Sequence, residues 1–225
     1  MEIITKNRLP LKYLLDICKI NSKAWDYGFE GCSIFNYWLC IWYCLTDYVS
    51  RQNNFVILAI DNNVCLGYIM ASIAGKPMRF HPVLFIINVF VSLLLLCSKQ
   101  GRQILANYKL YLYHLDKTVH LGKTILLGAN YKRASSIISV AVSLDHRKSG
   151  IYKLMTAWLM ESTDGYFVFH TSEESLYQAH EAVGYKRLYE IPYPKFNSIW
   201  DISSYVSFIM YGSKETLNLN NYQTK

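Results

Sequence analysis

The sequence predicts an α/β fold, in which a β-sheet is flanked by helices. Three stretches support this prediction: a β-hairpin over residues 55–70, a strand followed by a loop and a helix over residues 137–159, and a second strand followed by a helix over residues 167–183. The predicted strands are short, largely apolar runs, several of them rich in β-branched residues, whereas the predicted helices repeat apolar residues every three or four positions. Strands that alternate with helices in this way are typical of mixed α/β domains.

Two helices are predicted before the hairpin. The first spans Leu9–Ile20, with Pro10 at an early position that a helix tolerates. The second spans Ile34–Arg51 and carries aromatic residues on one broad face. Residues 21–31 between them are polar and contain glycine, so we expect a loop there.

The hairpin pairs Phe55–Ile60 with Val64–Met70. The intervening Asp-Asn-Asn segment at 61–63 tolerates the left-handed backbone conformations that tight turns need. Gly67 interrupts the second arm, and it predicts a β-bulge or a close approach of another part of the protein to the backbone.

Residues 76–133 form a predicted helical insertion. Pro82–Cys97 is almost continuously apolar, but its sixteen residues fall short of the ~20 that a membrane-spanning helix needs. Asn88 and Ser92 mark a narrow polar stripe within it, and a second helix is predicted over Gln103–Leu115. We favour two helices packed on the sheet or on the partner of a homodimer. Peripheral contact of residues 82–97 with a membrane surface is the second interpretation, and a true span is the third.

The second half of the chain alternates strands and helices. We expect residues 1–213 to form one domain and residues 214–225 to form a polar, flexible tail. The predicted elements after the insertion are a strand at 137–142, a helix from Ile151, a strand at Phe167–Thr171, a helix at Glu173–Val183, a loop at Pro192–Asn197 and a final strand at Tyr205–Tyr211.

Composition and charge narrow the classes of function. The formal net charge of +7 suits an anionic ligand or an anionic membrane surface. The chain has no dense Lys/Arg cluster and no aromatic-basic motif of the common nucleic-acid modules, so we expect no nucleic-acid partner. The six cysteines form no Cys-x-x-Cys pair, and no metal-ligand cluster is predicted. Residues 1–6 lack the order of a secretion signal, so the protein is expected to be cytoplasmic, with reduced thiols.

The loop at residues 145–150 is the strongest candidate for a binding site. It joins an apolar strand to a helix whose apolar residues begin at Ile151, so unpaired backbone N–H groups and the positive end of the helix dipole face the same point. Such a turn binds anions, which suggests a cofactor that carries phosphate. The alternative is an ordinary connection between a strand and a helix.

The residues around this loop resemble a known family, the GNAT superfamily of acyl-CoA-dependent N-acetyltransferases. In that family the pyrophosphate loop reads hydrophobic-Val-x-x-x-x-Arg/Gln-x-x-Gly-x-Gly/Ala and leads into a helix. This chain has Val142, Arg147 and Gly150 at the matching positions, and Tyr152 where the family has Gly or Ala.

A second block keeps the family's spacing around its last helix. The family pattern there is Asn, then Ala three positions on, Tyr four further on, and Gly-Phe after four more. This chain has Glu173, Leu176, His180 and Gly184-Tyr185 at those positions. The resemblance covers roughly residues 50–212, interrupted by the insertion. It implies a mixed, mostly antiparallel twisted sheet flanked by helices, with the helical insertion between the third and fourth strands.

The resemblance also implies acetyl-CoA as cosubstrate and a set of residues that bind it. Backbone N–H groups of the loop would hold the pyrophosphate, with added charge from Arg147 and Lys148. The pantetheine arm would lie in a gap between the fourth and fifth strands and pair with exposed backbone. The residues implied for cofactor binding are Val140, Ala141, Val142, Arg147, Lys148, Ser149, Gly150, Ile151, Tyr152 and Glu173.

Three residues are candidates for proton transfer. His180 occupies the position of the family's frequent proton donor, and a histidine pKa of ~6.5 suits that role. Tyr177 lies one turn earlier and competes with it, while His170 ends the fifth strand and is a candidate base. For both histidines the alternative is a purely structural role.

The function that we predict is transfer of an acetyl group from acetyl-CoA directly to a primary amine. The favoured acceptor is a small molecule, an amino-sugar or a nucleotide-linked amino-sugar, because the aromatic second helix and the basic-apolar insertion resemble GNAT members associated with bacterial surface-polysaccharide synthesis. The alternatives are acetylation of a protein, peptide or polyamine, a GNAT-fold module that binds without catalysis, and a membrane-associated scaffold.

Overall fold

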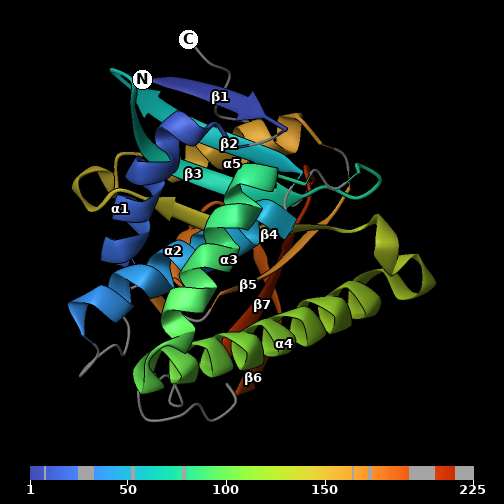
Figure 1. The fold of residues 1–225 in the computed structure, drawn as a ribbon. Helices are drawn as coiled ribbons and strands as arrows, with labels where there is room; N and C mark the ends of the chain where they lie inside the picture. Colours follow the sequence, from blue (N-terminus) through green and yellow to red (C-terminus); the bar gives the residue numbers. More distant parts are fainter. Residues whose placement is uncertain are drawn as a thin grey trace.

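A seven-stranded mixed sheet forms the centre of the molecule (Figure 1). The computed structural model describes residues 1–7, 9–24, 33–51, 54–77, 80–163, 165–171, 174–192 and 206–215. The strand order is β1-β2-β3-β4-β5-β7-β6, and every neighbouring pair is antiparallel except β4 and β5. This confirms the predicted α/β fold class with its mostly antiparallel sheet. The strands are β1 Glu2–Lys6, β2 Phe55–Asp61, β3 Val64–Ser72, β4 Ser135–Val142, β5 Phe167–Thr171, β6 Lys186–Pro192 and β7 Val206–Gly212.

Helices cover both faces of the sheet. One face carries α5 and α6 over a core that includes Ile57, Ile69 and Phe169. The opposite face carries α1, α2 and α3 over the β1–β4 half, while α4 lies across β5, β7 and β6 (Figure 1). The helices are α1 Leu14–Ala24, α2 Ile34–Arg51, α3 Pro82–Leu96, α4 Lys99–Leu127, α5 Ile151–Glu161 and α6 Glu174–Ala182.

The hairpin forms as predicted. Asn62 and Asn63 both have positive φ angles, 48° and 63°, so the turn uses the left-handed conformations that asparagine tolerates. The register shifts by one residue opposite Ala59 and Ile60, which is a β-bulge beside Gly67. A Cβ atom at Gly67 would lie 3.1 Å from the carbonyl oxygen of Ala141, so β4 approaches the hairpin closely there.

Several boundaries differ from the prediction. The first helix is a short 3₁₀ turn at Leu11–Tyr13 followed by α1, which runs to Ala24, four residues beyond the predicted end. Residues 25–31 of the predicted loop lie outside the described residues, as do residues 193–197 and 216–225. The second insertion helix was predicted to end at Leu115, but α4 continues to Leu127 because Val119 and Leu126 pack against the β5–β7 part of the sheet.

The edge strands β1 and β6 were not predicted. β6 reads Lys-Arg-Leu-Tyr-Glu-Ile-Pro, a sequence without a clear alternation of apolar and polar residues, and its residues are exposed or only partly buried. It forms because its backbone, from Lys186 to Pro192, pairs with β7. No helix in the described part of the chain is long and apolar enough to cross a membrane.

Candidate functional site

The central feature of the site is the separation of two parallel strands. β4 pairs with β5 only at Ser135 with Phe167 and Ser136 with Val168, although β4 continues to Val142. Beyond that point β4 stays paired with β3, as far as Val142 with Gly67. The register between β3 and β4 shifts at Ile138, which is the extra residue of a bulge. The edge of β4 that faces β5 is therefore open from the bulge onward in the described structure.

This open edge includes three of the predicted cofactor residues. Val140, Ala141 and Val142 pair with β3 on one side, opposite Ile69, Tyr68 and Gly67 respectively. A strand has pairing groups on two sides, so an extended ligand inserted between β4 and β5 finds backbone donors and acceptors.

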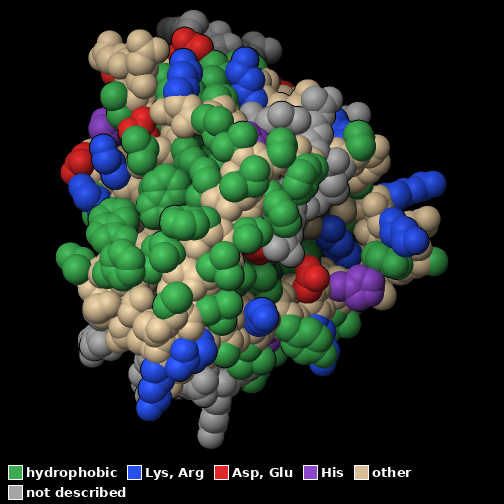
Figure 2. Space-filling model, in the orientation of Figure 1, with side chains coloured by type: hydrophobic (Ala, Val, Ile, Leu, Met, Phe, Trp, Pro, Cys, Tyr) green, Lys and Arg blue, Asp and Glu red, His purple; other side chains and the backbone are tan. Residues whose placement is uncertain are grey.

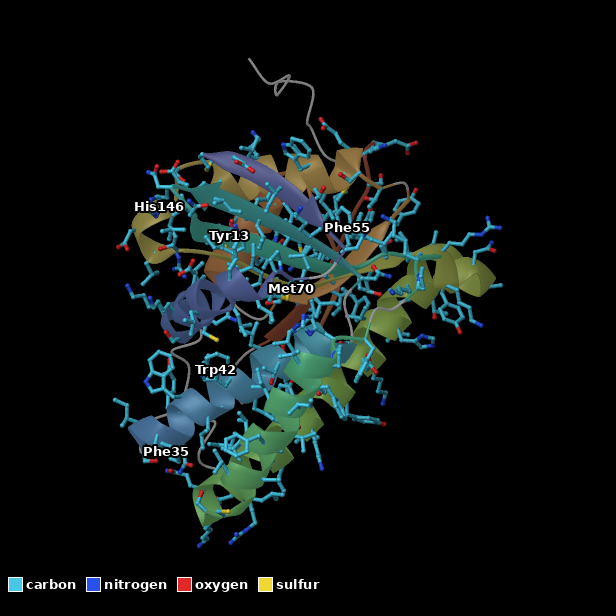
Figure 3. The ribbon with its side chains drawn as sticks, turned by 45° about the horizontal axis from the view of Figure 1, so that its top comes forward. Tyr13, Phe35, Trp42, Phe55, Met70 and His146 are labelled. Atoms are coloured by element: carbon cyan, nitrogen blue, oxygen red, sulfur yellow. The ribbon has the colours of Figure 1, made fainter. Side chains whose placement is uncertain are left out.

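β4 leads directly into the loop that the sequence identified. A 3₁₀ turn at Leu144–His146 is followed by Lys148 with a φ of 65° and Gly150 with a φ of 83°. Arg147, Lys148 and Ser149 are exposed. Figure 3 shows His146 on this loop, at the opposite end of the sheet from Phe55, the first residue of β2.

Gly150 is the N-cap of α5, and its left-handed conformation turns the chain into the helix. The backbone N–H of Leu154 donates to the carbonyl oxygen of Gly150 at 3.0 Å, which begins the helical ladder. The N–H groups of the first turn, from Ile151, lie before that bond and have no acceptor within the helix. A Cβ atom at Gly150 would meet no heavy atom within 4 Å apart from its chain neighbours, so this side of the helix cap is open.

Tyr152 does not project into that space. Its hydroxyl is hydrogen-bonded to Nδ1 of His180 on α6, and the two rings meet edge to face with centroids 5.3 Å apart. Burial raises the pKa of the Tyr152 hydroxyl well above its usual value, so the phenol is protonated at neutral pH. The large residue at this family position is thus turned toward the core and leaves the backbone of the loop accessible.

His180 is 2% exposed and stands in an aromatic enclosure. The ring of Phe169 lies 4.7 Å from it and that of Tyr185 5.8 Å, measured between centroids. Burial lowers the pKa of His180 to about 3, so the imidazole is neutral at pH 7. It contacts β5 at Phe169, immediately after Val168, where β4 and β5 part.

Tyr177 is engaged elsewhere. Its hydroxyl donates to Glu181 one turn further along α6, and its ring stacks on Phe208 of β7 at 4.7 Å. The guanidinium of Arg187 lies 5.6 Å from the centre of the same ring. These contacts place the ring of Tyr177 against β7 and its hydroxyl on Glu181.

His170 lies on the other face of the sheet. Along β5, Phe167 and Phe169 join the core under α5 and α6, while Val168 packs on the α4 side, so His170 shares the α4 side with Val168. The ring of Tyr111 on α4 is 6.1 Å from that of His170. Burial, with a smaller contribution from His114, lowers the pKa of His170 to about 3.

His114 links this cluster to β7. Its Nε2 atom is 2.9 Å from the hydroxyl oxygen of Ser207, and burial together with Lys117 lowers its pKa. Sequence reasoning did not identify Tyr111, His114 or Ser207 as site residues. They come from α4 and β7, and they lie near His170 only because α4 crosses the sheet at this point.

Two cavities lie outside the open stretch of the β4 edge. One of about 590 Å³ lies beside α4 and reaches Ser136 at the start of β4. It is lined by Tyr113, Asp116, Lys117, Val119, His120, Lys123, Tyr131, Lys132 and Ser136. Figure 2 shows a hollow with basic side chains beside the right-hand part of the molecule, over α4. The other, of about 510 Å³, lies at the β1 edge and includes Lys6, Lys12 and Asp61.

One predicted residue, Glu173, lies outside the described residues. Within the described ranges, no group of three or more His, Cys, Asp or Glu side chains is arranged to hold a metal ion.

Comparison with known proteins places the fold. No family model and no curated protein matches this sequence. Among solved structures, an N-acetyltransferase from Staphylococcus aureus Mu50 has a TM-score of 0.51 at 11% identity, covering 93% of this chain and 100% of its own. The protein smu.2055 from Streptococcus mutans UA159 has a TM-score of 0.50 at 8% identity, covering 95% of this chain and 99% of its own. With the strand order and the β4–β5 separation described above, the chain has the fold of GNAT acetyltransferases.

Proposed function

We propose that this protein is an N-acetyltransferase that transfers the acetyl group of acetyl-CoA directly to a primary amine. The observation that carries the proposal is the combination of an open β4 edge with a loop that enters α5 through the left-handed Gly150. An extended ligand with a phosphate-bearing end matches both parts, because the strand edge pairs with amide groups and the helix start attracts anions.

In this proposal the loop binds the pyrophosphate of CoA. The backbone N–H groups of the first turn of α5, from Ile151, face the anion, whereas those of Arg147 and Ser149 donate to the carbonyl oxygens of Leu144 and His146 within the loop. The exposed side chains of Arg147 and Lys148 add positive charge. Ser149 contributes to the shape of the loop, since its hydroxyl donates to the carbonyl oxygen of His146 at 2.6 Å. Val140, Ala141 and Val142 present the backbone that pairs with the pantetheine arm.

Acetyl-CoA supplies an acyl group that is activated as a thioester. The protein must then place the amine, accept its proton and return a proton to the departing sulfur. We place the amine on the α4 face, where His170 lies beside Tyr111 and His114. Burial disfavours the charged form of His170 as it does that of His180, so we assign His170 to orienting the amine as a hydrogen-bond acceptor, and the proton of the amine passes to water. Backbone N–H groups at the open β4 edge would stabilise negative charge that develops on the thioester oxygen.

We assign the donating side to the α5–α6 face. The hydroxyl of Tyr152 is the candidate donor, because its raised pKa keeps it protonated. His180 acts as a positioning residue for that hydroxyl, since its own charged form is strongly disfavoured by burial. Tyr177, whose hydroxyl is committed to Glu181, is the weaker candidate.

The favoured acceptor remains an amino-sugar, and the cavity beside α4 supports a nucleotide-linked form. The cavity begins at Ser136, two residues along β4 from the bulge at Ile138, so it lies at the far end of the strand gap from the pyrophosphate loop. Lys117, Lys123 and Lys132 outnumber the one carboxylate that lines it, Asp116. A diphosphate bound there would leave an attached sugar directed toward the gap.

The test is calorimetric titration of the purified protein with acetyl-CoA, with desulfo-CoA and ATP as controls. Micromolar affinity for acetyl-CoA, similar affinity for desulfo-CoA and much weaker affinity for ATP would support a site that binds the whole cofactor. Absence of binding by a protein that circular dichroism shows to be folded would reject the enzyme and favour a GNAT-fold module without catalysis. If binding is found, an assay for free thiol in the presence of candidate amino-sugars identifies the acceptor.

A further inference from the structure

We propose that the outer face of α3 docks the protein onto the surface of a bilayer that contains anionic lipids. This inference is independent of the proposed acetyl transfer, because it rests on a surface of the insertion and not on the strand gap. It concerns attachment parallel to the membrane plane: at 1.5 Å per residue the fifteen residues of α3 span only about 22 Å, less than the ~30 Å hydrocarbon core.

The inward face of α3 holds the polar residues of the helix. Asn88 is buried, and its amide nitrogen donates to the carbonyl oxygen of Tyr43 and to the hydroxyl of Thr46, both at 3.1 Å on α2. Ser92 donates to the carbonyl oxygen of Asn88 at 2.6 Å. The predicted polar stripe therefore faces the protein, where its hydrogen bonds are satisfied, together with buried Leu84, Val91 and Leu95.

The outward face is apolar along its whole length, which is the reverse of an ordinary surface helix. Ile86 is 66% exposed and Phe90, one turn later, is 61% exposed. Hydrophobic side chains gather on this side of the molecule over α3 (Figure 2). The exposed apolar residues of α3 are Val83, Ile86, Val89, Phe90, Leu93 and Leu96, and Phe80 precedes them.

The charges around α3 match an anionic surface. Between residues 62 and 115, the part of the sequence that contains α3, there are five Lys and Arg residues and no acidic residue. Lys99 and Arg102 follow the end of α3 and are exposed, and the guanidinium of Arg102 donates to the carbonyl oxygen of Leu96 at 2.9 Å. Basic side chains beside an exposed apolar helix are the pattern by which proteins bind the interface of anionic membranes.

The same charges argue against a second copy of this chain as the occupant. In a two-fold dimer through α3, each basic end would meet basic residues of the other copy, and residues 62–115 contain no carboxylate to offset them. A lipid surface offers hydrocarbon to Ile86 and Phe90 and phosphate to Lys99 and Arg102.

The experiment is co-sedimentation of the full chain with vesicles. Vesicles of phosphatidylcholine mixed with phosphatidylglycerol are compared with vesicles of phosphatidylcholine alone, at low and at high NaCl. We expect sedimentation with the anionic vesicles, reduced by salt and much weaker with neutral lipid. The double variant Ile86→Ser/Phe90→Ser removes two exposed apolar side chains and is expected to lower the partition coefficient by about tenfold or more.

The matched control is Leu15→Ser/Val64→Ser, which changes two exposed apolar residues on α1 and β3. It is expected to sediment like the unmodified protein. Equal loss in both double variants, or no binding to anionic vesicles at all, would overturn the proposal. So would a dimer in light scattering that Ile86→Ser/Phe90→Ser converts to a monomer, since the face would then be an interface between copies.

Discussion

The hydroxyl of Tyr152 in the first turn of α5 is hydrogen-bonded to Nδ1 of His180 on α6. Tyr152 lies where the GNAT pattern that this sequence resembles has a small residue, and His180 lies where that pattern has a tyrosine, so two departures from the pattern meet in space. Their contact joins α5 to α6, and the ring of His180 lies 4.7 Å from that of Phe169 on β5, next to the point where β4 and β5 separate.

Removing the hydroxyl tests this pair. We expect Tyr152→Phe to lower kcat by about a hundredfold, the usual scale for a lost general acid, with acetyl-CoA affinity within a few-fold of the unmodified protein. The free energy of unfolding should fall by about 1–3 kcal/mol, because Nδ1 of buried His180 loses its partner. Steady-state kinetics and urea denaturation measure both, with Tyr37→Phe as the control, because it also removes a hydrogen-bonded hydroxyl but lies on α2, outside the proposed site. An unchanged kcat would remove Tyr152 from the reaction.

The loop assignment is tested by a charge placed at Gly150. Gly150→Asp puts a carboxylate into the open space before the first turn of α5, and we expect acetyl-CoA binding to weaken by at least about a hundredfold. Gly150→Asn has nearly the same shape, tolerates the left-handed conformation and carries no charge, so it should bind within about tenfold of the unmodified protein. Calorimetry on both variants decides the point: equal affinities would mean that no anion binds there.

Stability should fall as the pH is lowered below about 6.5. Burial lowers the pKa of His180 from 6.5 to about 3, so between these values the unfolded chain binds a proton that the folded chain does not. The free energy of unfolding should therefore lose about 1.4 kcal/mol per pH unit from this histidine as the pH decreases through that window.

Urea denaturation at pH 7, 6 and 5 measures this slope. His180→Gln has no group that titrates there, so its slope should be shallower by the contribution of one histidine. Parallel slopes for the two proteins would show that His180 is not held neutral by burial.

The acceptor cavity is tested by its lysines. Lys123→Gln/Lys132→Gln should raise the KM for a nucleotide-linked amino-sugar by about tenfold and leave the KM for acetyl-CoA unchanged, because both side chains line the cavity beside α4. Lys109→Gln changes an exposed lysine of α4 that does not line the cavity, and it serves as the control. If the KM for the free amino-sugar rose by the same factor, the lysines would not bind the phosphate groups of the acceptor.

Two glycines of α4 should respond differently to alanine, although both gain about 1 kcal/mol of helix propensity. A Cβ atom at Gly101 would lie 2.0 Å from the backbone oxygen of Leu95, so Gly101→Ala must displace the α3–α4 turn and should cost about 2–4 kcal/mol. At Gly122 the nearest atoms are Cγ2 of Ile209 at 2.8 Å and Cγ1 of Val168 at 3.0 Å, both on buried side chains and not on the backbone, so the cost should be smaller, about 1–2 kcal/mol. Thermal unfolding ranks the two, and the reverse order would contradict the packing described for the turn.

Local sequence patterns predicted the elements whose conformation depends on neighbouring residues in the sequence. The β2–β3 turn follows from Asn62 and Asn63, which tolerate positive φ, and the loop at residues 145–150 follows from a β-branched strand that leads through Gly150 into an apolar-periodic helix. These features depend on residues within about ten positions of one another, so backbone sterics and side-chain periodicity suffice to indicate them.

The tertiary structure decided the features that depend on distant partners. β6 forms because its backbone pairs with the edge of β7. The C-terminal half of α4 remains helical because Val119 and Leu126 pack against the sheet. The side chain of Tyr152 turns inward because His180, 28 positions away, offers an acceptor. Sequence alone marked Asn88 as polar within an apolar helix. Only its contacts with Tyr43 and Thr46 decided that this polar face points inward and the apolar face outward, because an amide is buried only where its hydrogen bonds are made.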